Sequence, residues 1–244
     1  MKVVNNMNKL YSKLARVYHE MYQSIFDYKK EFKFYHKFLK KYKCRKILEI
    51  GCGSGNLASF FLKNGYNYVG LDLFNEMLKI AREVESKAKF VQGDMNNLKL
   101  KDRFDAILIT GRSFTYLTTN KDVMSTLQSV HRHLKKNGIL IFDNFNAQMI
   151  FTNFSKRLIQ TAKYQNRRYK RITQKSLNLQ SGWTWNLNET YIVQENNKTK
   201  VIKNKEILRA FTEDELKLFL KLNNYELIKT IKDDFSITII AKRL

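Results

Sequence analysis

The sequence predicts an α/β protein, in which an open, mostly parallel sheet carries helices on both faces and a small antiparallel sheet is inserted near its end. Apolar strand-like runs alternate with helical patterns between residues 46 and 144, as in sheets built from strand–helix–strand units. The segment 47–55, ILEIGCGSG, joins a strand to a helix through a glycine-rich turn. Residues 167–211 switch to a period of two, which is typical of antiparallel strands.

The glycine turn gives the first indication of a ligand site. Glu49 lies near the end of the apolar run, and Gly51, Gly53 and Gly55 follow at alternate positions. Glycine lets a backbone approach a ligand closely, and the helix that follows directs free N–H groups at an anionic group. The dinucleotide-binding fingerprint G-x-G-x-x-G is not matched, because Asn56 stands at the position of its last glycine.

Further candidate ligand residues follow the next two predicted strands. The run YNYVGLD ends at Asp72, about twenty residues past the first glycine, where a carboxylate can accept hydrogen bonds from both hydroxyls of a ribose. The pattern FNEMLKIARE then predicts a helix with Met77 on its apolar face. The run KFVQGDM places Gly93, Asp94 and Met95 after a short third strand.

This order of motifs resembles the class I S-adenosylmethionine (SAM) methyltransferases, whose first motif is a G-x-G-x-G turn preceded by an acid in the strand. The resemblance implies a Rossmann-like sheet of seven strands, the last one antiparallel, and SAM as the cofactor. In the family, the acid of the GD turn hydrogen-bonds the adenine amino group. The resemblance implies that the core contacts the cofactor through Glu49, Gly51, Cys52, Gly53, Gly55, Asp72, Leu73, Met77, Gly93, Asp94, Met95 and Thr110.

The alternative interpretation is a generic α/β domain whose glycines only serve tight turns. That alternative accounts for the three glycines. It gives no reason for Asp72 and Asp94 to stand at two strand ends, where half-buried carboxylates are costly unless something pairs with them.

Two amphipathic basic helices are predicted before the first strand, over 8–24 and 28–42. Such charge is typical of the solvated face of a packed helix, and the alternative is a helix that lies on a membrane surface. The predicted apolar faces consist of Leu10, Leu14, Val17 and Met21 in the first helix, and of Phe32, Tyr35, Phe38 and Leu39 in the second.

The first of these helices resembles a cap that closes over the cofactor in the family, with a pattern similar to Y-x-x-x-A-x-x-Y-D. Tyr11, Ala15 and Tyr18 match this pattern, whereas His19 replaces the acid and leaves that position without an assigned role. The resemblance implies that Tyr11 and Tyr18 contact the methionine end of SAM. The alternative is that both tyrosines are ordinary core aromatics.

Candidate substrate contacts lie at the expected carboxyl edge of the sheet, where ligands bind in open α/β folds. Arg112 and Ser113 come just after the fourth predicted strand, 104–111, and Asp143 lies in the fifth, 138–144. Each of them can instead be a polar residue that caps a loop. The sequence assigns no catalytic residue and contains no cluster with metal-ligand spacing.

The segments after the fourth strand carry their own boundary signals. A helix is predicted over 120–135, ended by Gly138, with Lys135 and Lys136 near its C-terminus. Thr212 and Glu215 have the spacing of a capping box, and a closing hairpin follows over Asp233–Asp234.

The period-two segment predicts antiparallel strands at 167–174, 183–193 and 199–211, inserted between the fifth strand and the last helix. Trp183 and Trp185 form either the packing core of this small sheet or a wall of the substrate site. The predicted division of the chain is an N-terminal helical cap at 1–45, a SAM-binding core at 46–150 and 211–244, and a β-rich insertion at 151–210 that roofs the active site.

Composition limits the partners and the compartment. The formal net charge is +23, and residues 1–46 and 156–209 each hold 13 Lys/Arg against 3 Asp/Glu. This charge either serves an anionic partner or reflects coding bias. No run is long and apolar enough for a membrane span, and the first ten residues lack the apolar core of a signal peptide. Two cysteines are too few for a disulfide framework, which predicts a reducing, cytoplasmic compartment.

The whole pattern resembles the branch of the family that includes dTDP-amino-sugar N,N-dimethyltransferases. The resemblance implies transfer of a methyl group from SAM to an N or O nucleophile of a small metabolite that can be anionic. Nucleic acid is the second choice of partner: methylation of RNA (rRNA or tRNA) or of protein is the alternative function, and a non-catalytic SAM-binding protein is another. The chain contains no proline, so the Asn-Pro-Pro-aromatic motif and a Pro-Cys nucleophile are both absent.

Overall fold

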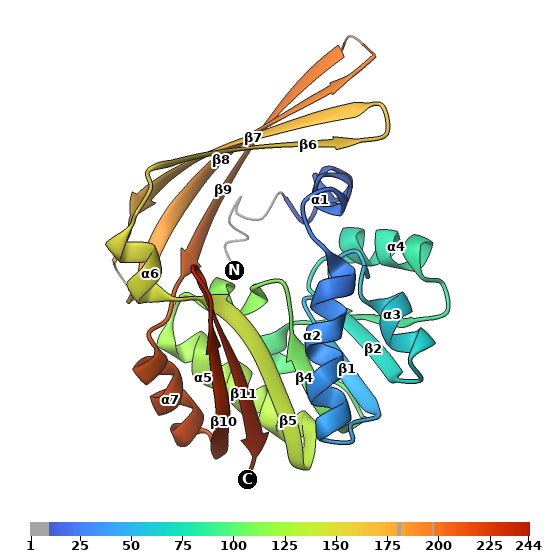
Figure 1. Cartoon of the computed structure of the whole chain (residues 1–244), viewed down its shortest axis with the longest axis vertical. Coiled ribbons are helices and arrows are strands. Elements are labelled where there is room, and N and C mark those ends of the chain that lie inside the picture. The colour runs from blue at the N-terminus through green and yellow to red at the C-terminus, as the bar shows by residue number, and fades with distance from the viewer. Residues whose placement is uncertain (1–9, 180–181, 197) are drawn as a thin grey trace, which may run out of the picture.

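The protein consists of a large sheet with helices on both faces and a smaller sheet above one of its edges (Figure 1). The computed structural model describes residues 10–179, 182–196 and 198–244. Residues 1–9, with the first part of the helix predicted over 8–24, lie outside the described residues.

The large sheet has seven strands in the order β10-β11-β5-β4-β1-β2-β3. Its five N-terminal strands pair in parallel, and β11 pairs antiparallel to both β5 and β10. This confirms the predicted seven-stranded sheet with an antiparallel last strand and a closing hairpin. The strands are β1 (Lys46–Ile50), β2 (Asn67–Asp72), β3 (Lys89–Gln92), β4 (Phe104–Ile109), β5 (Leu134–Phe145), β10 (Tyr225–Lys232) and β11 (Ser236–Arg243).

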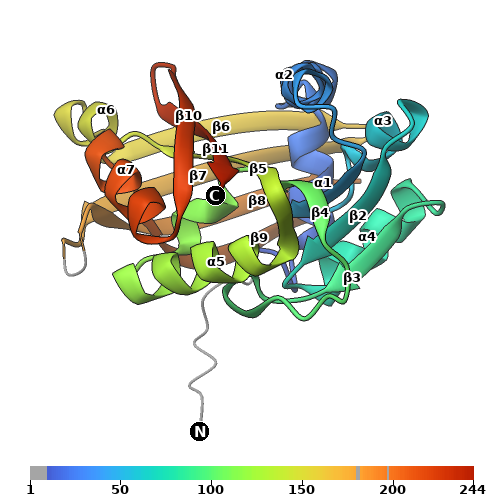
Figure 2. The same ribbon diagram turned by 90° about the horizontal axis from the view of Figure 1, so that it is seen from below.

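Each face of this sheet is covered because alternate strand residues point to opposite sides and both sides are apolar. In β1, Ile47 packs against one set of helices, whereas Leu48 and Ile50 pack against the other. Figure 2 shows the two helical layers from below. One layer contains α2 (Tyr28–Lys41), α3 (Ala58–Lys63) and α4 (Asn75–Val84), and the other contains α5 (Asn120–His133) and α7 (Glu213–Leu222).

The boundary between α5 and β5 differs from the prediction. The helix ends at His133, and β5 already begins at Leu134, which pairs with Phe104. The register then shifts, because the next pair joins Ala106 to Ile139. Gly138 therefore lies in an irregular part of a strand and does not end the helix; a Cβ there would come within 2.8 Å of a backbone carbonyl oxygen. Sheet pairing overrides the local helix-stop signal.

The inserted sheet leaves and rejoins the core at one point. Ala147 N donates to Phe211 O and Phe211 N donates to Phe145 O, so the two ends of the insertion are held together. The capping box of Thr212 and Glu215 then opens α7, as predicted. The insertion contains α6 (Ala147–Thr152), β6 (Arg157–Tyr164), β7 (Arg167–Leu177), β8 (Thr184–Glu195) and β9 (Lys198–Arg209), paired antiparallel in this order. The prediction missed α6 and β6.

Helix α1 (Ala15–Gln23) lies between the inserted sheet and the core (Figure 1). It is shorter than predicted, since the preceding residues 10–14 form turns. The predicted apolar face is buried against Tyr169 and Tyr191 of the inserted sheet. Glu20 accepts from Arg167 of β7 at 2.8 Å, which adds a charged contact to the apolar one.

Among the described residues, no helix is long and apolar enough to cross a membrane. The separation into a helical cap at 1–45, a core at 46–150 and 211–244, and an insertion at 151–210 that roofs the active site is a proposal. The contiguous four-stranded sheet and the single point at which it joins the core support it.

The packing of the glycine turn on α4 can be tested with a matched pair of glycines. Gly55 and Gly65 both have a left-handed φ, of 73° and 75°. A Cβ on Gly55 would lie 3.0 Å from the Cβ of Ala81, whereas on Gly65 the nearest atom is 3.9 Å away. We expect Gly65→Ala to cost about 1 kcal/mol of unfolding free energy for backbone strain alone, and Gly55→Ala to cost roughly 1–3 kcal/mol more for overpacking. Urea unfolding measures both, and equal losses would contradict the close packing.

Candidate active site

An open cleft of about 740 Å³ lies at the carboxyl edge of the large sheet, below the inserted sheet. The ends of β1, β2 and β3 contribute to it. Helix α1, the residues just before it and the turn after β4 also contribute. Ten of the predicted site residues line it: Tyr11, Tyr18, Gly51, Gly53, Asp72, Leu73, Gly93, Asp94, Met95 and Ser113.

The glycine turn lies against neighbouring backbone, which explains its composition. Gly51 has φ 71°, and a Cβ there would come within 1.9 Å of Ser113 Oγ. Its N–H donates to Leu71 O at 2.8 Å, which ties the turn to the end of β2. Ser113 Oγ in turn donates to Thr110 O at 2.8 Å. Only glycine leaves room for this packing without a clash.

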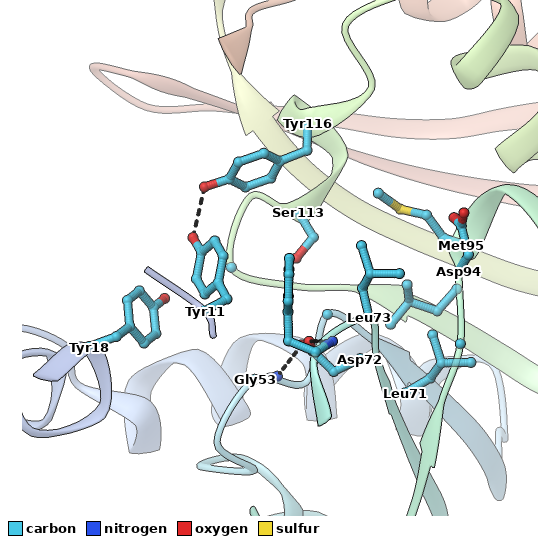
Figure 3. Close-up of a pocket in the computed structure, with 15 residues that line it drawn as sticks. Tyr11, Tyr18, Gly53, Leu71, Asp72, Leu73, Asp94, Met95, Ser113 and Tyr116 are labelled. Atoms are coloured by element: carbon cyan, nitrogen blue, oxygen red, sulfur yellow. Dashed lines mark hydrogen bonds between the residues drawn. The ribbon is translucent and has the colours of Figure 1, made fainter. Parts of the chain in front are cut away.

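Asp72 lies at the centre of the cleft and binds two backbone amides (Figure 3). Its Oδ2 accepts from Gly53 N and its Oδ1 from Phe74 N, both at 2.9 Å. Burial raises the pKa of this carboxyl, and the amide hydrogen bonds oppose that shift. The side chain therefore fixes the glycine turn and still has lone pairs for a ligand hydroxyl.

The two ends of the cleft differ in chemistry (Figure 3). Asp94 and Met95 lie at one end, with Asp94 exposed and its Oδ1 accepting from Asn96 N at 2.9 Å. Aromatic residues lie at the other end, where the Tyr11 and Tyr116 hydroxyls are 2.7 Å apart and the Tyr11 ring contacts that of Tyr18. One end can hold a flat base beside an acceptor carboxylate, and the other can place aromatic rings around a positively charged group.

Five predicted cofactor residues lie behind the cleft. Glu49 is buried and accepts from Tyr68 at 2.6 Å and from Thr110 Oγ1 at 2.8 Å. These contacts connect β1, β2 and the end of β4 beneath the glycine turn. Cys52 and Met77 are buried, and Gly55 faces α4. The five residues that do not line the cleft are Glu49, Cys52, Gly55, Met77 and Thr110.

Helix α1 contacts the glycine turn directly through hydrogen bonds. His19, the departure from the resembled pattern, has its Nδ1 2.8 Å from Ser54 Oγ. Gln23 donates to Asn56 Oδ1 at 2.5 Å one turn later. Burial and the nearby Arg16 lower the pKa of His19, so the ring favours its neutral form. His19 thus has a structural contact here that the sequence did not assign.

Of the four predicted substrate residues, only Ser113 lines the cleft. Arg112 has φ 60°, donates its N–H to Asp143 Oδ1 at 3.2 Å and lays its guanidinium over the Phe145 ring. Trp183 is 39% exposed and packs against Phe151, away from the residues that line the cleft. Its neighbour Trp185 is part of the core of the insertion.

Tyr116 and Glu206 are site residues that the sequence analysis missed. Tyr116 lines the cleft, and its hydroxyl donates to Glu206 Oε2 at 2.8 Å. Glu206 is only 4% exposed and lies on the buried face of β9. In the sequence, Lys203 and Lys205 alternate with Asn204 and Glu206, which was the available signal for an inward-facing acid, but no pattern indicated its partner.

Four basic residues of the insertion point away from this acid, whereas Arg171 lies on the same face of the sheet as Glu206. Arg168, Lys170, Lys203 and Lys205 are exposed, and they alternate with the buried Tyr169, Asn204 and Glu206. Alternate residues of a strand lie on opposite faces. These cations therefore occupy the outer face of the inserted sheet, and the face toward the cleft carries Glu206.

Comparisons with known proteins agree with the fold. Residues 47–138 match a family model described as a methyltransferase domain. The chain is 39% identical over 102 residues to the protein named YqeM of Bacillus subtilis (strain 168). It is 30% identical over 97 residues to the dTDP-3-amino-3,4,6-trideoxy-alpha-D-glucopyranose N,N-dimethyltransferase of Streptomyces venezuelae. Each alignment covers 40% of this chain, which spans only 41% of the length of either relative.

The whole fold is shared with a solved structure. An S-adenosylmethionine-dependent methyltransferase from Clostridium acetobutylicum ATCC 824 superposes with a TM-score of 0.80 at 21% identity, covering 95% of this chain and 98% of that one. Residues 47–138 thus match a methyltransferase domain, and the chain has the fold of the SAM-dependent methyltransferases. This confirms the resemblance drawn from the glycine turn and Asp72.

The buried environment of Glu206 predicts a pH-dependent stability. Burial, with a contribution from Glu189, raises its pKa from 4.5 to about 7. The folded protein therefore binds this proton more tightly than the unfolded chain, so the stabilisation is present below pH 4.5 and lost as the pH rises through 7. We expect the unfolding free energy of the wild type to fall by about 3 kcal/mol relative to Glu206→Gln over this interval. Parallel pH curves in urea titrations would contradict the raised pKa.

Proposed function

We propose that the protein transfers a methyl group from SAM to a nitrogen or oxygen nucleophile of a small molecule. The observation that carries this proposal is the glycine turn fixed by Asp72 within a cleft of the matching fold. Asp72 would accept from the ribose hydroxyls, and Asp94 and Met95 would hold the adenine. Gly51, Gly53 and the tyrosine end would take the methionine part. SAM supplies an activated methyl group on its sulfonium.

The side chains of this chain act by binding, orienting and excluding water. Tyr11 and Tyr18 lie over the cleft from the segment that leads into α1 and from α1 itself. Their rings pack against each other, and the Tyr11 ring also packs against Phe74, which follows Asp72 in the turn. This aromatic cover keeps water from the position of the reacting carbon and surrounds a positive charge with ring faces.

A small metabolite is the favoured acceptor. Tyr18 of α1 lines the cleft, and the inserted sheet lies above it, on the side where an acceptor beside the cofactor would enter. One relative is named as an N,N-dimethyltransferase of a dTDP-linked amino sugar, which supports nitrogen as the nucleophile. An RNA or protein acceptor has weaker support, because the exposed lysines of the insertion lie on its outer face.

A non-catalytic SAM-binding protein would have the same cleft, so only a measurement of turnover separates it from a methyltransferase. Formation of S-adenosylhomocysteine in the presence of small-molecule acceptors supports the enzyme, and binding without any turnover contradicts it. We also propose a reducing, cytoplasmic location, since Cys44 and Cys52 are both buried free thiols.

The role of Asp72 can be measured by calorimetric titration with SAM. Asp72→Asn replaces one acceptor oxygen by a donor, so it loses a charge-assisted hydrogen bond to the ribose and loosens the glycine turn. We expect affinity to fall by about 1.5–3 kcal/mol, or roughly 10- to 100-fold. Asp102→Asn is the control, because Asp102 pairs with Lys46 outside the cleft. Equal affinities in all three proteins would remove the central argument.

The cover over the cofactor predicts ligand-dependent hydrogen exchange. If Tyr11 and Tyr18 close on the cofactor, amide exchange across residues 11–18 slows when S-adenosylhomocysteine is added. The hairpin strand β10 lies at the far edge of the sheet and serves as the internal control. Unchanged exchange at 11–18 would show that the tyrosines are ordinary packing residues.

A further inference from the structure

The buried face of the inserted sheet carries a polar cluster made of Arg171, Glu189, Asn204 and Glu206. These residues come from β7, β8 and β9, and three of them are nearly inaccessible, with Glu189 5%, Asn204 2% and Glu206 4% exposed. Burial of two carboxylates is costly unless hydrogen bonds or cations compensate it. The contacts of the cluster show how unequally the two are compensated.

Glu189 has a cationic partner and Glu206 does not. Arg171 Nη1 lies 3.6 Å from Glu189 Oε1, and Tyr191 also donates to Glu189. Asn204 Nδ2 donates to both carboxylates at 3.0 Å. Within the described part of the chain, no Lys, Arg or His forms an ion pair with Glu206, whose partners are Asn204 and Tyr116. Arg171 acts on Glu206 only without an ion pair, so the negative charge of Glu206 is compensated less than that of Glu189.

A chain of hydroxyl groups joins Glu206 to the cleft. Tyr116 donates to Glu206 at 2.8 Å, and the Tyr11 hydroxyl lies 2.7 Å from that of Tyr116. Both tyrosines line the cleft, with Ser113 and Asp72 on the side of the glycine turn (Figure 3). Glu206 itself is covered, so a molecule in the cleft meets the tyrosine hydroxyls first and the carboxylate through them.

We propose that the methyl acceptor is an amine that arrives as an ammonium ion, and that Glu206 takes up its proton through Tyr116. This inference rests on the proposed methyl transfer and adds to it the class of nucleophile and the proton acceptor. Glu206 acts through Tyr116 and is a positioning residue in this scheme.

The proton and electron balance is complete with SAM as the only co-reactant. The ammonium gives one proton to the Tyr116 oxygen while the Tyr116 proton passes to the Glu206 carboxylate, which leaves a neutral amine. The nitrogen lone pair then forms the N–C bond to the methyl carbon as the C–S bond breaks and its electron pair stays on sulfur. The product leaves as a methylated ammonium, and Glu206 returns its proton to solvent.

The cluster can accommodate both states of Glu206. Asn204 Oδ1 has no hydrogen-bond partner, although the residue is 2% exposed. When Glu206 is protonated, the new O–H forms on Oε2, beside Tyr116, and can donate back to the Tyr116 oxygen, while Asn204 Nδ2 still donates to Oε1. The charged and titratable groups around Glu206 are Glu189 on β8, Arg171 on β7, Tyr116 after β4, and Tyr11 and Tyr22 near α1. Burial and Glu189 outweigh the rest and raise the pKa to about 7, where a carboxylate exchanges protons readily.

The position of the transferred methyl group tests the class of nucleophile. An extract of polar bacterial metabolites is incubated with the protein and SAM that carries a trideuterated methyl group, and mass spectrometry locates the label. The inference predicts labelled amines. Label on oxygen or carbon would overturn it while leaving the proposed methyl transfer intact. No labelled product, with SAM binding intact, would contradict the proposed methyl transfer itself.

The proton acceptor is tested with Glu206→Gln and Tyr116→Phe, compared with Glu195→Gln as the control. Glu195 lies at the far end of β8 and pairs with Arg167. We expect both test variants to form labelled amine roughly 100-fold more slowly at pH 7.5, and the control to match the wild type. The wild-type rate should rise as the pH increases through about 7. In Glu206→Gln that rise should move to the higher pKa of the free amine.

A structural role alone would lower activity at every pH without moving the profile, and that result would overturn the inference. A second readout does not depend on turnover. Carboxyl carbon NMR of glutamate-labelled protein, with the Glu206 signal assigned by its loss in Glu206→Gln, follows its titration without SAM. The inference predicts that Tyr116→Phe shifts this titration, and an unshifted curve would contradict the coupling. Circular dichroism and urea unfolding establish that each variant is folded.

Discussion

The site depends on one buried carboxylate at the end of a parallel strand. Asp72 accepts from Gly53 N and Phe74 N, and its own carbonyl accepts from Gly93 N. One residue therefore joins the turns after β1, β2 and β3. A buried acid without hydrogen-bond partners would be unfavourable. The backbone amides therefore stabilise the carboxylate of Asp72, and the carboxylate satisfies the amides in return. The sheet edge is preorganised for a ligand that offers hydroxyl groups to the same carboxylate.

The second feature that shapes the site is the position of α1. This helix contacts the glycine turn through His19 and Gln23 and the inserted sheet through Glu20. It therefore couples the layer that holds the cofactor site to the layer that carries Glu206. Tyr11, which precedes the helix, is the point where these layers meet, because its hydroxyl contacts Tyr116 and its ring packs on Phe74. Closure of the site and placement of the acid are consequences of the same docking.

The elements that could be predicted from sequence are those set by contiguous patterns. The predicted faces of α1 and α2 are buried, and the capping box opens α7, because helical spacing and caps act within one or two turns. The start of β5 was wrong because pairing between Leu134 and Phe104 outweighs the local stop signal at Gly138. Strand β6 was missed because its residues are exposed or half-buried, which leaves no apolar alternation to detect.

The sequence by itself determined the side of the cleft that the glycine turn forms. Its glycines and Asp72 belong to adjacent strands joined by a short crossover, so spacing along the chain fixes their proximity in space. The other side of the cleft was decided by tertiary structure. Tyr116 and Glu206 are 90 positions apart, and they meet only because the insertion folds back over the sheet edge. The folding of the insertion also decides the position of Trp183, which packs against Phe151 and does not line the cleft. No local pattern records which strands pair across such a distance, because that choice is made by burial of the whole sheet.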